Sequence, residues 1–507
     1  MSKLSQWFPL FIFVLILASC QDDDFDFVTE TDVAEFLNSD YTIELNPYGN
    51  NPLAAKISFE TSTDVTISAK VLGDYEMTTD GNEPATEHSY NIIGLYPNSA
   101  NQVVLTYTSS DDRFARDTVE IQTQALPDYL PTIDIVEREA RSNALTLAEF
   151  SLGNNGVFQT QPFMVDPFGE IRWYLDLTSL GGWASPFKRL ANGNLLFARN
   201  EAIYEYSWAG EELNRWDIPG YYQHHEILER ENGNFIVAVD KLGIGTVEDH
   251  MIEVDRSTSE IVKEWDLRQI LDVDRFDLFE DPNDWFHMNA IAFDESDQSL
   301  IVSGRHQGVV KISYDNELIW ILSPHKGWGN AGIDGMGYET SAFLLTAVNS
   351  EGTPYPQSIQ DGDEETDDFN WVWGQHAPMI LENGNIFIYD NGFNRRFTGD
   401  VQYSRGVEYA IDEEQLTVQE VWQYGRERGA DFFSPIISDV DVNQAGNRVI
   451  TSGIIATPEG PQSIITEVDR SKNVIYEVKL NFKNQFSNGT FSWGNLDLCY
   501  RSEQIQF

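Results

Sequence analysis

The chain has 507 residues and a formal charge of −50 at neutral pH, because 82 acidic residues outnumber 32 basic ones. A surface with this charge repels a phosphate backbone, so the composition argues against a nucleic-acid partner. It also repels small anions, so a site for an anionic substrate needs a local cluster of positive charge.

The first twenty residues have the layout of a secretory signal that ends at a lipidation site. Lys3 precedes an apolar run at residues 8–17, which is too short to span a bilayer. The run ends in Leu17-Ala18-Ser19-Cys20, which resembles the lipobox at which a cysteine is acylated. We therefore predict a lipoprotein signal peptide at residues 1–20, lipidation at Cys20, and anchoring to the membrane as an outer-membrane lipoprotein of the cell envelope, on its periplasmic or cell-surface face.

The next two segments are predicted to be a tether and a small domain. Residues 21–36 begin with an acidic run and are interpreted as a solvated tether. Residues 37–128 contain short β-branched and aromatic runs that predict a β-sandwich, with strands at residues 41–45, 55–59, 65–71, 102–107 and 118–122. Pro127 and Pro131 mark its boundary. Cys499 is the one cysteine beyond Cys20, so no intramolecular disulfide is expected.

Residues 129–507 carry a repeat with two markers. The first is a tight hairpin turn before an apolar strand, at residues 192–194, 232–234, 296–298 (degenerate), 383–385 and 445–447. The second is an apolar strand with a large aromatic side chain, at Trp173, Trp216, Trp265, Trp320, Trp422 and Tyr476. Six copies predict an all-β fold, a six-bladed β-propeller, with an insertion of about fifty residues before Trp422.

The two ends of this repeat complement each other. Tyr476 is followed by an apolar strand at residues 491–500, after which no sequence remains for outer strands. A hairpin at residues 163–173 precedes the first complete repeat, so N-terminal strands can complete the last blade and remove its open edge. A β-solenoid or two sandwiches would leave this complementarity unexplained.

Polar residues recur where the innermost strand of each blade is expected to begin. Counting back seven residues from each turn gives Ser185, His225, Asn289, His376 and Ser438. A buried strand would otherwise offer Val, Ile or Leu there. Strand alternation turns His287 to the same face as Asn289, and turns only one of His224 and His225 to the axis. Arg305 returns to the same rim on the next antiparallel strand, so we predict one shared pocket.

Histidines at such a rim have other interpretations. Any one of them is more commonly a surface or core residue, but several beside an arginine indicate a site. Histidine clusters also bind zinc or copper. The sequence lacks a compact motif such as His-Glu-x-x-His, and Arg305 would repel a cation, so we expect no metal. The acidic run at residues 361–368 lacks EF-hand spacing and is interpreted as a solvated loop, with calcium binding left open.

Six strings of residues form a more specific pattern along the mature chain. They are Gly94-Leu95-Tyr96-Pro97-Asn98, His224-His225-Glu226, His287-Met288-Asn289, Ser303-Gly304-Arg305-His306-Gln307, Phe369-Asn370-Trp371-Val372-Trp373-Gly374-Gln375-His376 and Tyr403-Ser404-Arg405. In this order they resemble the arylsulfate sulfotransferases of bacterial envelopes. The resemblance covers nearly the whole mature chain, and the string that ends at His376 is specific.

The resemblance implies that His376 is a nucleophile that becomes transiently sulfated. The residues that would act with it, bind the transferring group or lie near it are His225, His287, Arg305, Asn289 and Ser438. It further implies ping-pong transfer from an aryl sulfate donor to a phenolic acceptor, without the nucleotide PAPS or another cofactor. These residue types suit the reaction, because positioning and charge stabilisation dominate sulfuryl transfer as they do phosphoryl transfer.

Several alternatives stay open at this point. Either His225 or His287 could act as general acid and base. Water could replace the phenol, giving aryl sulfate hydrolysis, and a non-enzymatic propeller that binds a partner at the cell surface is another alternative. An apolar slot for the aryl ring has the candidates Trp371, Trp373, Phe393 and Tyr500. The sequence leaves open whether the chain forms a homodimer.

Overall fold

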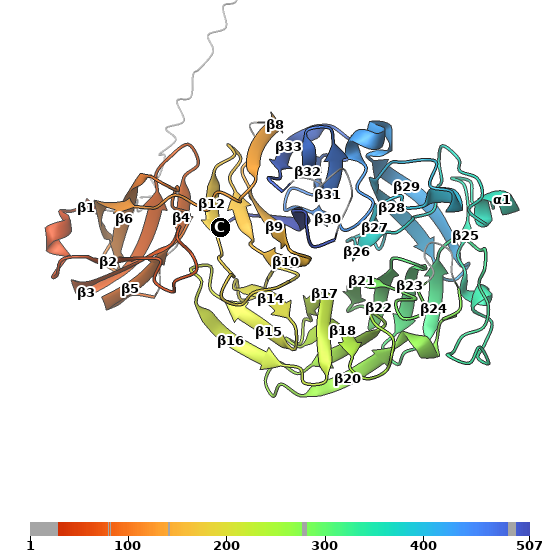
Figure 1. The fold of residues 1–507 in the computed structure, drawn as a ribbon. Helices are drawn as coiled ribbons and strands as arrows, with labels where there is room; N and C mark the ends of the chain where they lie inside the picture. Colours follow the sequence, from red (N-terminus) through yellow and green to blue (C-terminus); the bar gives the residue numbers. More distant parts are fainter. Residues whose placement is uncertain (1–28, 80, 82, 140–141, 276–280, 485–492) are drawn as a thin grey trace, which may run out of the picture.

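The computed structural model describes residues 29–79, 81, 83–139, 142–275, 281–484 and 493–507 (Figure 1). The predicted signal peptide at residues 1–20, its lipidation site Cys20 and residues 21–28 of the tether lie outside the described residues. Within the described part, no helix is long and apolar enough to cross a membrane. Strands dominate and form a small N-terminal domain and a ring of six sheets, which confirms the predicted fold.

The N-terminal domain is built around one long strand, β3 (Ala55–Val71). The first half of β3 pairs with β2 (Thr42–Leu45) and β5 (Ala85–Ile92), and its second half pairs with β4 (Met77–Thr79) and β6 (Ala100–Ser109). The strand β7 (Arg113–Gln122) pairs with β6. Burial alternates along both halves of β3, as expected for a strand with one face on a core.

This domain begins earlier than residue 37, where the predicted tether ends. The strand β1 (Thr29–Glu30) pairs in parallel with β7, and the 3-10 turn η1 (Val33–Glu35) follows it. Phe36 is fully buried and stacks on Tyr107, with 6.4 Å between ring centroids. Residues 29–36 therefore belong to the folded domain, because burial of the Phe36 side chain stabilises the packing of this short acidic segment against it. The boundary placed between residues 128 and 129 falls between β7 and β8 (Thr132–Arg138) and stays a prediction.

The six sheets of the ring are numbered here as blades in chain order (Figure 1). Blade 1 contains β9 (Leu145–Asn154), β10 (Val157–Thr160), β11 (Phe163–Val165), β12 (Ile171–Tyr174) and β34 (Leu498–Ile505). Blade 2 contains β13 (Lys188–Arg189), β14 (Leu195–Arg199), β15 (Ala202–Tyr206) and β16 (Glu212–Asp217). Blade 3 contains β17 (Tyr221–Glu229), β18 (Phe235–Lys241), β19 (His250–Val254) and β20 (Ile261–Asp266).

The second half of the ring carries the predicted insertion. Blade 4 contains β21 (Met288–Asp294), β22 (Ser299–Gly304), β23 (Gly308–Ser313) and β24 (Leu318–Leu322). Blade 5 contains β25 (Thr346–Ala347), β26 (His376–Ile380), β27 (Ile386–Asp390), β28 (Arg405–Asp412) and β29 (Thr417–Tyr424). Blade 6 contains β30 (Asp439–Val442), β31 (Arg448–Thr457), β32 (Gly460–Val468), β33 (Val474–Asn481) and β8. The short helical segments are η2 (Leu267–Gln269), η3 (Thr340–Phe343), α1 (Gln357–Gln360), η4 (Arg395–Phe397) and η5 (Arg426–Phe432).

Strands from both ends of the propeller sequence close the ring. The C-terminal strand β34 pairs with β9 and completes blade 1 from the axial side. The strand β8, which precedes blade 1 in the sequence, pairs with β33 as the outermost strand of blade 6. The predicted complementarity is confirmed, because N-terminal strands supply the outer part of the blade that β34 completes. Closure covers sheet edges that would otherwise be open.

Five of the six aromatic markers join one blade to the next by a hydrogen bond. All six are buried, and five are tryptophans whose indole N–H groups donate to the following blade. The pairs are Trp173 with the Trp208 carbonyl, Trp216 with Arg256, Trp265 with Tyr314, Trp320 with the Glu413 carboxylate, and Trp422 with Arg470, at 2.6 to 3.0 Å. Because a buried indole N–H needs an acceptor, this bond explains why tryptophan recurs at the position.

The hairpin turns are held by a buried charge on the third strand of the same blade. Asn194 donates to Glu205 at 2.6 Å, and equivalent bonds recur at Glu253, Glu408 and Glu467. In blade 4 the position is occupied by Lys311, which donates to Asp297 at 2.7 Å. This exchange explains the degenerate turn at residues 296–298, because a buried lysine requires a carboxylate where the other blades have an amide.

One buried arginine joins the propeller to the N-terminal domain. Arg172 of β12 is fully buried and donates to the Gly94 carbonyl at 2.6 Å. Its guanidinium lies over the Tyr96 ring at 3.6 Å from the centroid. The string at residues 94–98 is therefore part of the interface between the two domains.

We predict that Trp265→Phe lowers the free energy of unfolding by about 1–3 kcal/mol, because the Tyr314 carbonyl loses its buried donor. Urea titration followed by circular dichroism measures this change. Trp493→Phe is the matched control, since Trp493 is 51% exposed and outside the interblade pattern. Equal effects of the two substitutions would contradict the role given to the interblade bond.

Candidate active site

Three imidazoles and a guanidinium gather where the innermost strands of blades 3, 4 and 5 begin. The rings of His225 and His287 lie 5.4 Å apart. Tyr500 of β34 lies 5.8 Å from the His225 ring and 6.1 Å from the His376 ring. The backbone N–H of Arg305 donates to the His287 carbonyl at 2.9 Å, so the β21–β22 hairpin returns Arg305 to this rim. These four predicted residues therefore share one pocket, and their roles stay predictions.

The backbone leaves regular strand geometry at the same positions. His225 and His287 have φ values of 50° and 56°, and Ala377, next to His376, has a φ of 51°. The strand register shifts in β17, β21 and β26 at these points. Left-handed backbone is strained for residues other than glycine, and it clusters at functional sites. The shifts re-aim side chains out of the normal alternation.

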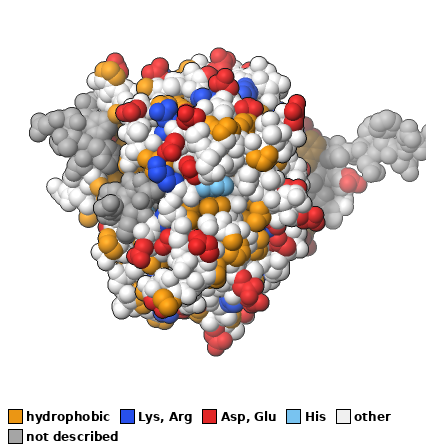
Figure 2. Space-filling view, turned by 90° about the vertical axis from the view of Figure 1, so that its right-hand side faces the viewer, with side chains coloured by type: hydrophobic (Ala, Val, Ile, Leu, Met, Phe, Trp, Pro, Cys, Tyr) orange, Lys and Arg blue, Asp and Glu red, His pale blue; other side chains and the backbone are white. Residues whose placement is uncertain are grey.

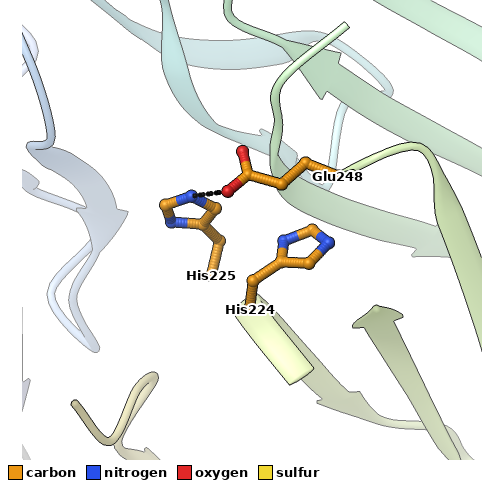
Figure 3. Close-up of side chains that lie close together, drawn as sticks. All are labelled: His224, His225 and Glu248. Carbon is orange, nitrogen blue, oxygen red and sulfur yellow. Dashed lines mark ion pairs between the residues drawn. The ribbon is translucent and has the colours of Figure 1, made fainter. Parts of the chain in front are cut away.

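The expectation that only one of His224 and His225 reaches the pocket does not hold. Both rings lie beside Glu248, with 5.4 Å between their centroids (Figure 3). The left-handed conformation of His225 is the physical reason, because it cancels the alternation of neighbouring side chains. His225 also contacts Tyr500, with 3.0 Å between its Nδ1 and the phenolic oxygen.

Two acceptors at one ring nitrogen orient His376. Its Nδ1 lies 2.8 Å from Asn391 Oδ1 and 3.1 Å from the Gly374 carbonyl. The orientation of the Asn391 amide is defined, because its Nδ2 donates to the carbonyls of Ser434 and Ile437 at 2.8 Å each. Nδ1 must therefore carry the proton, and Nε2 keeps a lone pair. Among the described residues, none forms a hydrogen bond with this Nε2.

The environment of His376 also keeps the ring neutral. The residue is 2% exposed. Burial, reinforced by the positive charge of Arg305, holds the pKa of His376 well below its usual range, and the hydrogen bond to Asn391 opposes this only in part. A neutral imidazole with a lone pair on Nε2 has the properties of a nucleophile.

His287 has the opposite environment. Its Nδ1 lies 2.6 Å from Asp284 Oδ2 and 3.0 Å from Glu248 Oε2. Burial disfavours the charged ring, but the charge of Glu248 and the hydrogen bond to Asp284 outweigh burial and raise the pKa of His287 to about 9. His287 is therefore an imidazolium at neutral pH and carries a second N–H on Nε2.

Arg305 supplies the positive charge that an anion needs in this acidic protein. Acidic side chains are scattered over the molecular surface, as Figure 2 shows for one face. The guanidinium of Arg305 forms no ion pair among the described residues, and its buried Nε has no hydrogen-bond partner. It lies 4.9 Å from the centroid of the Phe393 ring. Because a buried charge without a partner is costly, this guanidinium is suited to binding an anion.

Asn289 and Ser438 support the pocket from behind. Asn289 Nδ2 donates to the Gln375 carbonyl at 2.7 Å, so it positions the start of the strand that carries His376. Ser438 Oγ donates to Ser434 Oγ at 2.9 Å and thereby braces the loop whose carbonyls hold Asn391. These contacts indicate positioning, and the predicted role of both residues in substrate binding stays a prediction.

Two of the four aromatic candidates for a substrate slot lie at the pocket. Tyr500 contacts the imidazoles and Phe393 lies beside Arg305. Trp371 and Trp373 are each 2% exposed and pack in a hydrophobic core cluster with side chains of blades 4 and 5. The slot for an aryl ring therefore has Tyr500 and Phe393 as its candidates.

Sequence reasoning missed four residues that hold the pocket together, namely Glu248, Asp284, Asn391 and Arg501. Glu248 and Asp284 lie in connections before β19 and β21, where no periodicity marks them. Asn391 could have been found from the strand pairing. Tyr389 pairs with His376 in the sheet, and Asn391 follows Tyr389 by two residues. Arg501 pairs with Glu226 at 2.6 Å, one residue away from the Tyr500–His225 contact.

A cavity of about 480 Å³ lies along the axis, lined by residues that follow the pocket residues on the innermost strands. Within it, Lys188 and Arg501 both pair with Glu226 at 2.6 Å. Among the other carboxyl groups that line the cavity, burial raises the pKa of four, to about 8 for Glu149 and about 7 for Asp439, Asp441 and Glu503. Neither carboxyl oxygen of Glu149 has a hydrogen-bond partner.

Two groups of side chains have the composition and spacing of metal ligands. The ligand atoms of each group lie within 4.8 Å of one another, and the groups are His224 with His225 and Glu248, and Asp284 with His287 and His306. The second group contains the imidazolium of His287, whose Nδ1 proton a metal at that atom would have to displace.

Comparison with known proteins identifies the family of this chain. Residues 123–491 match the arylsulfotransferase (ASST) family, and residues 42–124 match the arylsulfotransferase Ig-like domain. The arylsulfate sulfotransferase AssT of Lelliottia amnigena is 29% identical, over 86% of this chain and 89% of its own. The protein of that name from Escherichia coli O6:H1 is 28% identical, over 81% of this chain and 84% of its own.

Solved structures add little to this comparison. A protein of unknown function from Bacteroides caccae is similar at 12% identity and a TM-score of 0.25, over 52% of this chain and 96% of its own. The fold and the sequence matches define the chain as a six-bladed propeller enzyme with an Ig-like N-terminal domain. The chain belongs to the arylsulfotransferase (ASST) family.

We predict that one imidazole titrates near pH 9, because Glu248 and Asp284 stabilise the charged ring of His287. Glu248→Gln removes one of these charges and should move the titration toward neutral pH. Histidine-selective isotope labelling and NMR titration measure the midpoint of this imidazole in the wild type and in Glu248→Gln. The folded-state pKa lies above that of an unfolded histidine, about 6.5, so this stabilisation is complete below pH 6.5 and is lost toward pH 9. The absence of an imidazole midpoint near pH 9 that Glu248→Gln lowers would contradict the assignment.

A second pH effect is predicted for Glu149, whose pKa of about 8 lies above the ordinary value of 4.5. The unfolded chain therefore ionises this carboxyl first, and stability falls as pH rises from 4.5 to 8. Glu149→Gln keeps the neutral form and should raise the melting temperature more at pH 8 than at pH 5. Glu231→Gln, at an exposed residue of the same cavity lining, is the control. A gain that is equal at both pH values would count against this account.

Proposed function

We propose that the protein transfers a sulfuryl group from an aryl sulfate ester to a phenolic acceptor through a sulfohistidine at His376, without PAPS. The supporting observation is the lone pair on Nε2 of a neutral His376 in the same pocket as the unpaired guanidinium of Arg305. The names of the two curated relatives support the substrate class. Membership of the family favours an enzyme over the alternative of a binding propeller.

In the first step, Nε2 of His376 attacks the sulfur atom of the ester. The N–S bond forms as the bond from sulfur to the aryl oxygen breaks, and that oxygen leaves with a proton from an acid in the pocket. The sulfated ring keeps its proton on Nδ1, where Asn391 and Gly374 accept hydrogen bonds and stabilise the positive ring. The phenol then departs while the sulfuryl group stays on the enzyme, which makes the reaction ping-pong.

Arg305 stabilises the group in transfer. A sulfuryl group spreads negative charge over its oxygens, and a fixed guanidinium offers several donors to them. Because no described carboxylate pairs with Arg305, its positive charge is available to an anionic substrate. This local charge offsets the repulsion of an anion by a chain with a net charge of −50.

His287 is a better candidate for the acid than His225. Its pKa of about 9 keeps it protonated at neutral pH, and this value is close to that of a phenol, about 10 by analogy with tyrosine. Proton transfer between groups of similar pKa is nearly balanced in both directions. After it has donated a proton, His287 remains next to Glu248 and Asp284, which favour its return to the charged form.

In the second step, the acceptor phenol gives its proton to His287 and its oxygen attacks the sulfur. The N–S bond breaks and neutral His376 is regenerated. Water in place of the phenol would make the protein a sulfatase. Tyr500 and Phe393 favour a phenol, because they offer rings against which an aryl group can pack.

We also propose that acylated Cys20 anchors the mature chain in the outer membrane. The support is the string Leu17-Ala18-Ser19-Cys20 after a short apolar run. The acidic residues that follow Cys20 would separate the lipid surface from the folded domain, whose first described strand begins at Thr29. Replacement of Cys20 by serine should release the protein from the membrane fraction, and unchanged membrane association would contradict the anchor.

We expect His376→Ala to lose at least about a thousandfold in turnover of a chromogenic aryl sulfate, because the nucleophile is removed. The release of the phenol, followed by absorbance, measures this rate. His325→Gln is the matched control, since His325 contacts the Leu345 carbonyl at 2.9 Å and the ring of Trp371 at 6.0 Å. Undiminished turnover by His376→Ala would contradict the proposal.

Product analysis with and without added phenol separates the two acceptors. Sulfuryl transfer predicts a sulfated phenol as the product and a rate that rises with phenol concentration. Release of inorganic sulfate at the same rate in both conditions would show a sulfatase instead.

A further inference from the structure

His224 has no task in the proposed reaction, yet it is buried in the wall of the pocket. Its side chain is 10% exposed, and neither of its ring nitrogens forms a hydrogen bond of ordinary geometry, although the Val239 backbone lies nearby. The nearest carboxylate, that of Asp240, lies 3.8 Å from Nε2, which is beyond hydrogen-bonding distance. Because buried polar groups are normally paired, an imidazole in this state is suited to a ligand that uses its lone pair.

The neighbours of His224 supply further ligands. Figure 3 shows the rings of His224 and His225 side by side, with the carboxylate of Glu248 next to them. His225 Nε2 and Glu248 Oε1 are 3.4 Å apart. Two ligand atoms of a tetrahedral zinc ion are separated by about 3.3–3.6 Å, given bonds of about 2.0–2.2 Å. This pair already has that spacing, and a small shift of His224 would bring in a third ligand, since all three lie within 4.8 Å.

The charges around the group are compatible with a cation. Carboxylates outnumber cations in the surroundings, which are Asp240, Glu248 and Asp284 against His287 and Arg305. The two cations oppose metal binding, so we expect a reversible site rather than a permanent one.

We propose that His224, His225 and Glu248 form a reversible zinc site, with water or a sulfuryl oxygen as the fourth ligand. This differs from metal-dependent catalysis, because the ion would occupy His225 and would withdraw Glu248 from His287. Bound zinc should therefore inhibit turnover. The inhibition rests on the proposed sulfuryl transfer, whereas the binding site does not.

The second group of ligands is a poorer site. Its central residue, His287, has Nδ1 only 2.6 Å from Asp284 Oδ2 and 3.0 Å from Glu248 Oε2, so two carboxylates already occupy the nitrogen that a metal would need. The Nδ1 of His306 already lies 2.8 Å from the Asp284 carbonyl. No carboxylate lies within hydrogen-bonding distance of His224, and this difference identifies the first group as the zinc site.

Isothermal titration of zinc chloride into the full chain, stripped with a chelator, tests the site without reference to activity. We expect one zinc ion per chain and a loss of at least about tenfold in affinity for His224→Gln, since changes even outside the ligand set cost that much. His88→Gln, in the N-terminal domain, is the matched control and should bind zinc as the wild type does. No binding by the wild type, or equal affinity in His224→Gln, would overturn the site.

Activity supplies the second readout. Relative to its own turnover without zinc, His224→Gln should require a higher zinc concentration for inhibition, by the factor seen in binding. If zinc binds through His224 but the wild type shows no turnover, the proposed function fails and the zinc site stands. If His224→Gln does not fold, cobalt binding to the wild type decides. Visible absorption typical of a tetrahedral nitrogen and oxygen site supports the site, and its absence counts against it.

Discussion

The hydrogen bond from Nδ1 of His376 to Oδ1 of Asn391 determines what the pocket can do. An imidazole can present a proton or a lone pair, and the partner of one nitrogen decides what the other offers. Asn391 accepts because its own amide group is engaged by the carbonyls of Ser434 and Ile437, in the connection that leads into blade 6. The connection into blade 6 thereby orients the imidazole on blade 5 that we propose as the nucleophile.

Burial and paired charge then separate the imidazoles into two roles. Burial and the positive charge of Arg305 disfavour protonation of the His376 ring. At His287, Glu248 and Asp284 outweigh the effect of burial and favour the protonated ring. Titratable groups whose pKa values are pushed apart are typical of acid–base sites. The left-handed backbone at His225, His287 and Ala377 costs free energy. The interblade tryptophan bonds and the closing strand β34 provide the rigid frame that can hold such strain.

Periodicity in the sequence was sufficient for the architecture, because five of the six blades carry a tryptophan that binds the next blade and five carry a turn that binds their own third strand. The degenerate turn at residues 296–298 belonged to the same pattern, with Lys311 and Asp297 in place of the glutamate and asparagine of the other blades. Strand alternation failed at His224 and His225, because a positive φ is not visible in a residue pattern. Glu248, Asp284 and Asn391 were missed because they lie at or between strand ends and act on neighbouring side chains. The burial of Phe36 was not predicted, because the acidic residues around it indicated a solvated tether.

The central claim is that Nε2 of His376 carries the sulfuryl group between the two half-reactions. The most direct test is mass spectrometry of the protein quenched after brief exposure to a chromogenic aryl sulfate without an acceptor. The account predicts the mass of one SO₃ group on the peptide that contains His376, and its disappearance when a phenol is added before quenching. Turnover with no sulfated peptide, or with the group on another residue, would contradict it.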